Sequence, residues 1–141
     1  FRYKMGYIYN LNRMVSLPFY YKYKLGGQSS LRGWLNTEQY DNSRGKLIYD
    51  LINVEYRFNI YKKWGGELFT DMGRLYNDIE DFITTNLSWN YGLGISYDTA
   101  FGPLRIEYAL PYLRSGIAQN NYDGSPPNKF GQIHVSLLYM F

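Results

Sequence analysis

Hydrophobic and polar side chains alternate with a period of two along most of this chain, which predicts β-strands with one apolar and one polar face. In the segment at about 87–99, Trp89 and Leu93 share one face, whereas Asn90 and Asp98 share the other. The same alternation predicts six strands, at about 1–11, 47–60, 64–75, 87–99, 104–112 and 130–141. We therefore expect an all-β fold of antiparallel strands.

The connections between the predicted strands alternate between short and long. Tight turns are expected at 61–63 and 100–103, and longer loops at about 13–46, 76–86 and 113–129. Outer-membrane β-barrels alternate short periplasmic turns with long external loops in the same way. Soluble antiparallel sandwiches have similar strands. The barrel is favoured because the apolar faces here carry large aromatic rings, whereas a sandwich more often buries smaller aliphatic side chains.

The composition agrees with a membrane-embedded sheet. Aromatic residues make up 20% of the 141 residues, and 17 of them are tyrosines, whose rings suit a boundary between apolar and aqueous surroundings. The mean hydropathy is -0.42, and no apolar stretch approaches the roughly 20 residues that a spanning helix requires. Barrel strands look hydrophilic on average because polar residues occupy every second position.

The residue content disfavours several classes of site. The chain has no cysteine, so it cannot form a disulfide, a cysteine-ligated zinc site or a thiol nucleophile. Its 15 basic and 12 acidic residues give a net charge of +3 and are scattered along the chain. Nucleic-acid binding is not expected, because no basic run is available to follow a phosphate backbone.

Six strands are too few to close a barrel. The smallest outer-membrane barrels have about eight strands, and an open strand edge in lipid would leave backbone groups unpaired. The chain also begins in a strand-like segment, without an initiator methionine or a signal-peptide pattern. We therefore expect residues 1–141 to be the carboxy-terminal portion of a larger transmembrane barrel, completed by upstream strands or by another chain.

A loop motif carries a specific resemblance to a known family. Residues 26–34 read Gly-Gly-Gln-Ser-Ser-Leu-Arg-Gly-Trp. This motif resembles the valine-arginine-glycine-aromatic signature in the sixth external loop of the BamA/TamA-type outer-membrane assembly-factor superfamily, which also holds two-partner secretion transporters and patatin-fused barrels. Leu31 and Trp34 depart from the commonest residues at their positions. Further similar segments follow in the family's order, at 53–58, 68–76 and 91–106, and Phe141 matches the terminal phenylalanine.

The resemblance implies a barrel of about 16 strands, with the loop at about 13–46 folded back into its lumen. In the family the loop arginine meets acidic groups on the inner wall. Here Arg32 is expected to bridge Glu55 and Asp71, which fall on the polar faces of neighbouring strands. A partly dehydrated guanidinium would form charge-assisted bonds with a bidentate geometry that lysine could not reproduce.

The motif comprises Gly26, Gly27, Leu31, Arg32, Gly33 and Trp34. We expect Gly33 to let the backbone turn tightly and Trp34 to pack the tip of the loop against the wall.

Other polar residues do not predict a cofactor, metal or catalytic site. His134 is a lone histidine on a polar face and is expected to line the lumen rather than to bind a metal. Gly92 and Gly94 lack the third glycine of a dinucleotide-binding loop, and are expected to allow a close approach of the loop or wall. The ligand spacing of a calcium-binding loop is absent from Asp78, Glu80 and Asp81.

Carboxylates on the predicted polar faces are candidates for acid-base chemistry. They are Glu55, Glu67, Asp71 and Glu107. Structural ion pairing is the favoured interpretation, because nothing in the sequence indicates a substrate cleft. No cofactor and no enzymatic activity are therefore predicted.

Together, the strand pattern and the resemblance predict an integral protein of the Gram-negative outer membrane that assists the folding and insertion of β-barrel proteins. By family analogy, the last strand borders a seam that opens to pair with a client strand, since unpaired strand edges pair readily. The apolar face of this strand carries Ile133, Val135, Leu137, Tyr139 and Phe141. Expected partners are outer-membrane lipids, client β-barrel proteins, the rest of the barrel and accessory lipoproteins.

Three alternatives remain open at this point, namely a two-partner-type protein secretion transporter, the barrel anchor of a patatin-like lipase and a plain porin. Upstream sequence would separate them. Several periplasmic repeat domains would favour assembly, two with a plug helix would favour secretion, and a Gly-x-Ser-x-Gly nucleophile elbow would favour the lipase. A porin should lack the combination of Arg32, Glu55 and Asp71.

Overall fold

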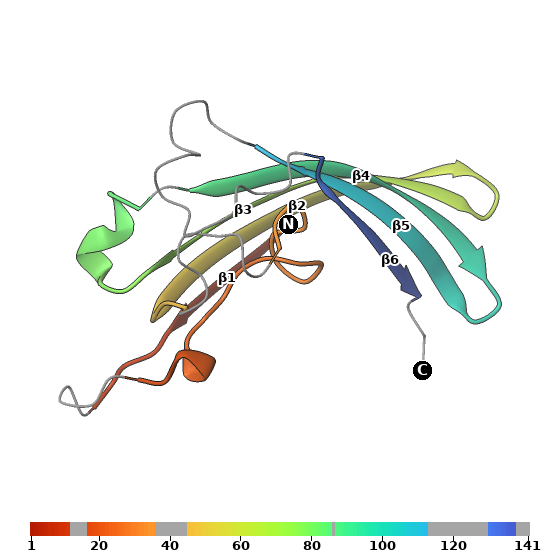
Figure 1. Ribbon diagram of the computed structural model, residues 1–141. Coiled ribbons are helices and arrows are strands. Elements are labelled where there is room, and N and C mark those ends of the chain that lie inside the picture. Colours follow the sequence, from red (N-terminus) through yellow and green to blue (C-terminus); the bar gives the residue numbers. More distant parts are fainter. Residues whose placement is uncertain (12–16, 36–44, 86, 113–129, 138–141) are drawn as a thin grey trace.

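The computed structural model describes residues 1–11, 17–35, 45–85, 87–112 and 130–137. These residues form one open antiparallel sheet in which each strand pairs with the next along the chain (Figure 1). Its six strands are β1 (Arg2–Tyr7), β2 (Ile48–Tyr61), β3 (Trp64–Tyr76), β4 (Ser88–Thr99), β5 (Gly102–Pro111) and β6 (Gln132–Leu137). The connections contain two short 3-10 helices, η1 (Phe19–Tyr21) and η2 (Ile79–Phe82). The expected all-β fold with six antiparallel strands is confirmed.

The sheet is strongly curved, and the loop at 17–35 lies inside the curve (Figure 1). The two tight hairpins, between β2 and β3 and between β4 and β5, lie at one end of the strands. The longer connection with η2 lies at the other end. Connection lengths therefore alternate between the two ends of the sheet, in the order that the sequence predicts.

The observed strands differ from the predicted ones mainly at their ends. The first strand stops at Tyr7 rather than Leu11. The turn expected at 100–103 is shorter, because Gly102 already pairs with Thr99. Gly102 has a φ of 122°, a conformation that is accessible mainly to glycine, and only two residues, Ala100 and Phe101, therefore separate β4 from β5.

The two faces of the sheet differ in chemistry, as the pleat requires when apolar and polar residues alternate. The outer face exposes large apolar side chains, among them Val54, Tyr56, Leu68, Trp89, Tyr91, Leu93, Ile95, Ile106, Ile133 and Val135. The inner face buries polar side chains, among them Asn53, Glu67, Asp71, Asn90 and Glu107. No helix in the described part of the chain is long and apolar enough to cross a membrane.

A charged pair interrupts the outer face near the end that carries η2. Asp50 accepts a hydrogen bond from Nε of Arg74, its partner on β3, at 2.7 Å. The Arg74 guanidinium also lies 3.5 Å from the ring centre of Phe82 in η2 and donates to the Phe82 carbonyl oxygen at 2.6 Å. The charge of Asp50, which breaks the apolar alternation of the second strand, is thus neutralised in place.

Candidate functional site

The motif loop folds into a compact turn before it reaches the wall. Gly26 and Gly27 have φ values of 125° and 78°, which favour glycine. The N–H of Gly27 donates to the carbonyl oxygen of Trp34 at 2.6 Å, and the N–H of Gly26 donates to the Ser30 hydroxyl at 2.7 Å. A second tight turn follows at 31–34, where the N–H of Trp34 donates to the carbonyl oxygen of Leu31 at 3.0 Å. The chain therefore turns at Gly33, although in this motif only Gly26 and Gly27 have positive φ.

Gly33 also allows the loop to approach the wall closely. A Cβ at this position would lie 2.6 Å from the Cβ of Asn90 and 3.0 Å from backbone atoms of Leu110 and Pro111. Backbone atoms in a paired strand cannot move aside cheaply. A larger residue at position 33 would therefore lift the loop from the wall.

Apolar contacts hold the loop on either side of Arg32. A buried cluster joins Leu25, Leu31 and Trp34 of the loop to Leu51 and Leu75 of the wall. The Nε1 of Trp34 also donates to the carbonyl oxygen of Trp89 at 3.2 Å. Trp34 thus packs against the wall, and the burial of this apolar surface favours the docked loop.

Arg32 is 4% exposed and points toward the carboxylates of the inner wall. Asp71 in β3 holds one edge of the guanidinium, with Nε donating to Oδ2 at 2.9 Å and Nη2 donating to Oδ1 at 2.8 Å. The backbone N–H of Arg32 donates to the same Oδ2 at 3.2 Å. This bidentate geometry fixes the orientation of the side chain as well as its position.

Three glutamates surround the other end of the guanidinium. Nη1 of Arg32 lies 3.0, 3.1 and 3.0 Å from the Oε1 atoms of Glu55, Glu67 and Glu107, respectively. Because Nη1 carries two hydrogens, it donates to Glu67 and Glu107, while Glu55 is attracted by charge. Arg32 therefore contacts both expected partners, Glu55 and Asp71, and two further carboxylates that we had not assigned to it.

An aromatic ring supports the flat side of the guanidinium. The Cζ of Arg32 lies 3.5 Å from the ring centre of Phe69 in β3, a geometry that is attractive for a cation over an aromatic face. The same ring covers Gly92 of β4, where an added Cβ would collide with it. Gly92 therefore makes room for a side chain of the neighbouring strand.

The cluster keeps Arg32 charged. Burial alone would lower the pKa of its guanidinium, but the hydrogen bond and charge of Asp71, with the charges of Glu107 and Glu55, raise this pKa above its usual value. A buried ion that loses its partner is strongly destabilising, by about 3–5 kcal/mol. Removing either Arg32 or its carboxylates is therefore expected to destabilise the fold.

Amide side chains extend the network across the sheet. The Nδ2 atoms of Asn53 and Asn90 donate to Asp71 at 2.7 and 2.9 Å. Asn53 also donates to the carbonyl oxygen of Ser30 at 2.9 Å. Its Oδ1 accepts from Nε and Nη2 of Arg2 in β1, at 3.0 and 2.8 Å. Hydrogen bonds through Asp71 thus connect β1, β2, β3 and β4 with the loop.

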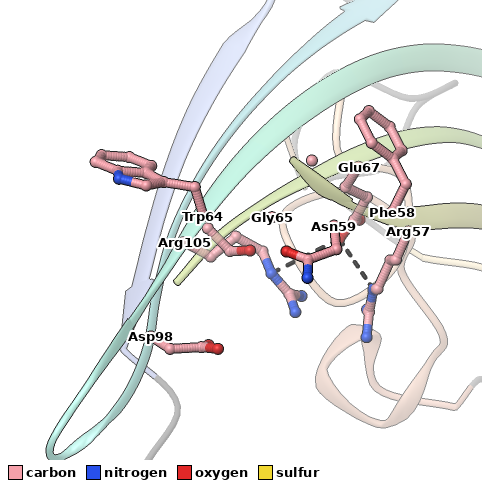
Figure 2. Close-up of a pocket in the computed structure, with 10 residues that line it drawn as sticks. Arg57, Phe58, Asn59, Trp64, Gly65, Glu67, Asp98 and Arg105 are labelled. Atoms are coloured by element: carbon pink, nitrogen blue, oxygen red, sulfur yellow. Dashed lines mark hydrogen bonds and ion pairs between the residues drawn. The ribbon is translucent and has the colours of Figure 1, made fainter. Parts of the chain in front are cut away.

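A polar pocket of about 300 Å³ opens beyond the glutamates, toward the tight hairpins (Figure 2). Figure 2 shows Arg57 and Arg105 on either side of Glu67, whose Oε2 lies 3.0 and 3.6 Å from their respective Nε atoms. Nη2 of Arg57 lies 2.6 Å from Oε2 of Glu55. These two arginines offset negative charge that Arg32 alone would leave unbalanced.

The strand register explains why residues so far apart in sequence meet. One row across the inner face contains Glu67, Gly94, Glu107 and His134, which are successive partners in β3 to β6. The next row contains Glu55, Phe69 and Gly92, and a third contains Asn53, Asp71 and Asn90. Asn53, Phe69 and Asn90 were not predicted as site residues, although Asn90 was placed on the polar face of its strand. Aligning the strands would have revealed them.

The last strand also reaches the motif. The Nε2 of His134 lies 2.7 Å from the carbonyl oxygen of Arg32. Ile133, Val135 and Leu137 are exposed on the opposite, outer face. Tyr139 and Phe141 lie outside the described residues. Within the described ranges, no group of three or more His, Asp and Glu side chains is arranged to hold a metal ion.

Comparison with known families agrees with this arrangement. The Omp85 superfamily domain matches residues 1–133. The chain therefore belongs to the Omp85 superfamily, which includes outer-membrane protein insertion and secretion transporters. The resemblance drawn from the loop motif and the flanking strands is confirmed at the level of the superfamily.

Proposed function

We propose that this Omp85 superfamily member forms the carboxy-terminal part of a barrel that assists the folding and insertion of β-barrel proteins into the Gram-negative outer membrane. In this role the loop that carries Arg32 braces the barrel wall from inside. Outer-membrane lipids contact the outer face, upstream strands complete the wall, and unfolded β-barrel proteins are the clients. Accessory lipoproteins are further proposed partners.

The docked arginine is the single observation that carries the proposal. Arg32 comes from a connection between β1 and β2, yet it binds carboxylates of β2, β3 and β5. A plain pore needs no such brace, because its backbone ladder already closes the wall. A wall that must open and close during insertion benefits from an internal support that holds its strands together.

The outer face suits a lipid surround. Its exposed apolar side chains, such as Leu68 and Leu93, are each about half exposed in the sheet, at 52% and 53%. Aromatic rings such as Trp64 and Tyr97, whose centroids are 4.8 Å apart near the tight hairpins, have the amphipathic character of residues at a membrane interface. Burial of this face in hydrocarbon leaves the charged inner face for the lumen.

The edge of β6 suits the pairing of a client strand. Within the described residues, β1 and β6 are the two edge strands of the sheet, and β6 pairs with β5 alone. An unpaired edge presents a row of backbone donors and acceptors that another strand can use. Because upstream strands continue the wall from β1 in this proposal, we assign the client-binding role to the edge of β6.

The test is client assembly by the full-length protein in phospholipid vesicles. We expect Arg32→Ala to slow the conversion of an unfolded outer-membrane protein to its heat-modifiable form by about ten-fold or more, because a loss of 3–5 kcal/mol in the brace leaves most loops undocked. Arg32→Lys should be intermediate, since lysine keeps the charge but not the fork.

Arg74→Ala is the matched control, because Arg74 also pairs with an aspartate and lies on a phenylalanine ring but does so on the outer face. Wild-type client assembly by Arg32→Ala would contradict the proposal. Vesicles that release a secreted partner protein but fail to insert clients would instead favour the secretion transporter.

A further inference from the structure

Among the described residues, the last strand, β6, has one neighbouring strand, as β1 does at the other edge of the sheet. It pairs with β5 over Gln132–Leu137. Its outer side chains Ile133 and Val135 are 69% and 64% exposed and contribute little packing within the described residues. A side-chain contact on its inner face therefore weighs heavily in how firmly β6 is held.

His134 provides such a contact, and its chemistry is unambiguous. The Nε2 of His134 lies 2.7 Å from the carbonyl oxygen of Arg32. A carbonyl oxygen can only accept, so Nε2 must carry the hydrogen and donate it. The imidazole ring is half-buried on the inner face. The loop motif is thus bound to β6 through its backbone, independently of the charges on the Arg32 side chain.

The cross-strand neighbour of His134 binds the other end of the same residue. Glu107 is the register partner of His134 on β5, and its Oε1 accepts from Nη1 of Arg32 at 3.0 Å. Arg32 therefore links two adjacent strands, because its Nη1 binds Glu107 of β5 and its carbonyl oxygen binds His134 of β6. If the loop moves, both contacts are strained together.

We infer that His134 is a positioning residue that fastens β6 to the docked loop, so that loop docking and the pairing of β6 stabilise each other. By thermodynamic reciprocity, whatever the docked loop adds to the stability of β6, a paired β6 adds to the docking of the loop. The inference deepens the proposed function, because it names the contact through which the brace acts on the client-binding edge.

Hydrogen exchange on the full-length protein in lipid nanodiscs tests the inference. In His134→Ala, we expect amide exchange to be about five-fold faster in Gln132–Leu137, as for the loss of a hydrogen bond worth about 1 kcal/mol. Exchange in 28–34 should rise to a similar degree. The amides of β2 and β3 should exchange as in the wild type.

Two further variants separate the hydrogen bond from general packing. In His134→Gln, the side-chain amide nitrogen has a similar reach and can donate to the same carbonyl oxygen, so wild-type protection is expected. Ser136→Ala is the matched control, because Ser136 lies on the same face of β6 and is the partner of Arg105 rather than a neighbour of Arg32. It should leave exchange unchanged.

The inference is overturned if His134→Ala exchanges like the wild type, if His134→Gln loses as much protection as His134→Ala, or if the faster exchange spreads evenly over all strands. Each of these outcomes is independent of client assembly. If exchange changes as expected while Arg32→Ala still inserts clients normally, the contact stands and the proposed function fails.

Discussion

Two arginines in this sheet make nearly the same local contacts, but with very different consequences. Arg32 and Arg74 each donate from Nε to an aspartate, at 2.9 and 2.7 Å, and each lies 3.5 Å from the ring centre of a phenylalanine. Arg32 is buried on the inner face, whereas Arg74 lies on the outer face with 18% of its side chain exposed. The chemistry of the pair alone therefore does not set its importance.

The difference lies in what each arginine joins. Arg74 pairs with Asp50, which is already its backbone partner across β2 and β3, so the ion pair adds little that the ladder does not supply. Arg32 belongs to a loop, and its carboxylates come from strands that have no backbone ladder to that loop. An arginine–carboxylate cluster matters most where it connects segments that no backbone ladder joins.

The largest difference in stability between the Arg32 and Arg74 sites is expected when their aspartates are replaced. Asp71→Asn should lower the free energy of unfolding of the barrel by about 3 kcal/mol, because a buried guanidinium loses its fork and its nearest negative charge. Asp50→Asn should cost about 1 kcal/mol, as is usual for a partly exposed pair. Urea unfolding of the full-length protein in vesicles measures both. Equal shifts in the urea unfolding midpoints of the two variants would contradict the expected difference between the sites.

A glycine substitution tests whether the inner site depends on the docking of the loop. Gly33→Ala should cost about 1–3 kcal/mol, the usual penalty for overpacking, because the new methyl group meets the backbone of β5. Gly65→Ala is the control, since its closest contact is the Ser96 hydroxyl, which can rotate away. Protease accessibility of the loop should rise in the first variant only. A loop that stays protected in Gly33→Ala would show that the close approach is not required.

The smallest difference in stability between the two sites is expected when their phenylalanines are replaced. Phe69→Leu should cost about 1–2 kcal/mol, since it removes the stack on a desolvated guanidinium and leaves a gap over Gly92. Phe82→Leu should cost about 0.5 kcal/mol, because Phe82 is 42% exposed and stacking at exposed sites is weaker. The same urea titration compares them. A larger effect for Phe82 would mean that η2, and not the motif loop, is the important cap of the sheet.

The alternation of apolar and polar residues was enough to predict much of the architecture. Side-chain parity within each strand was enough to assign Glu55, Glu67, Asp71 and Glu107 to the polar face, and the lengths of the connections predicted which ends carry the hairpins. The ends of strands were less predictable. Gly102 had been expected in a turn, because its pairing with Thr99 depends on a positive φ that the residue type permits but does not require.

The candidate site was predictable in part. The arginine and two of its carboxylates followed from the motif and from parity, whereas Glu67 and Glu107 required the register of β3 against β4 and β5. Register depends on how bulky side chains such as Phe69 fit over glycines of the next strand, which parity does not specify. The close approach of Gly33 to β5 was not predicted for a related reason, since contact with a distant strand leaves no local trace in the sequence.

The long sequence separations within the inner cluster have a consequence for the order of folding. The contacts of Arg32 with Glu67, Asp71, Glu107 and His134 span 35, 39, 75 and 102 residues. Until the strands that carry the three acids have paired, the guanidinium has no adequate counterion and is more stable in water. The loop that carries Arg32 is synthesised before these acids but is therefore expected to dock after them, so that its docking marks a completed wall.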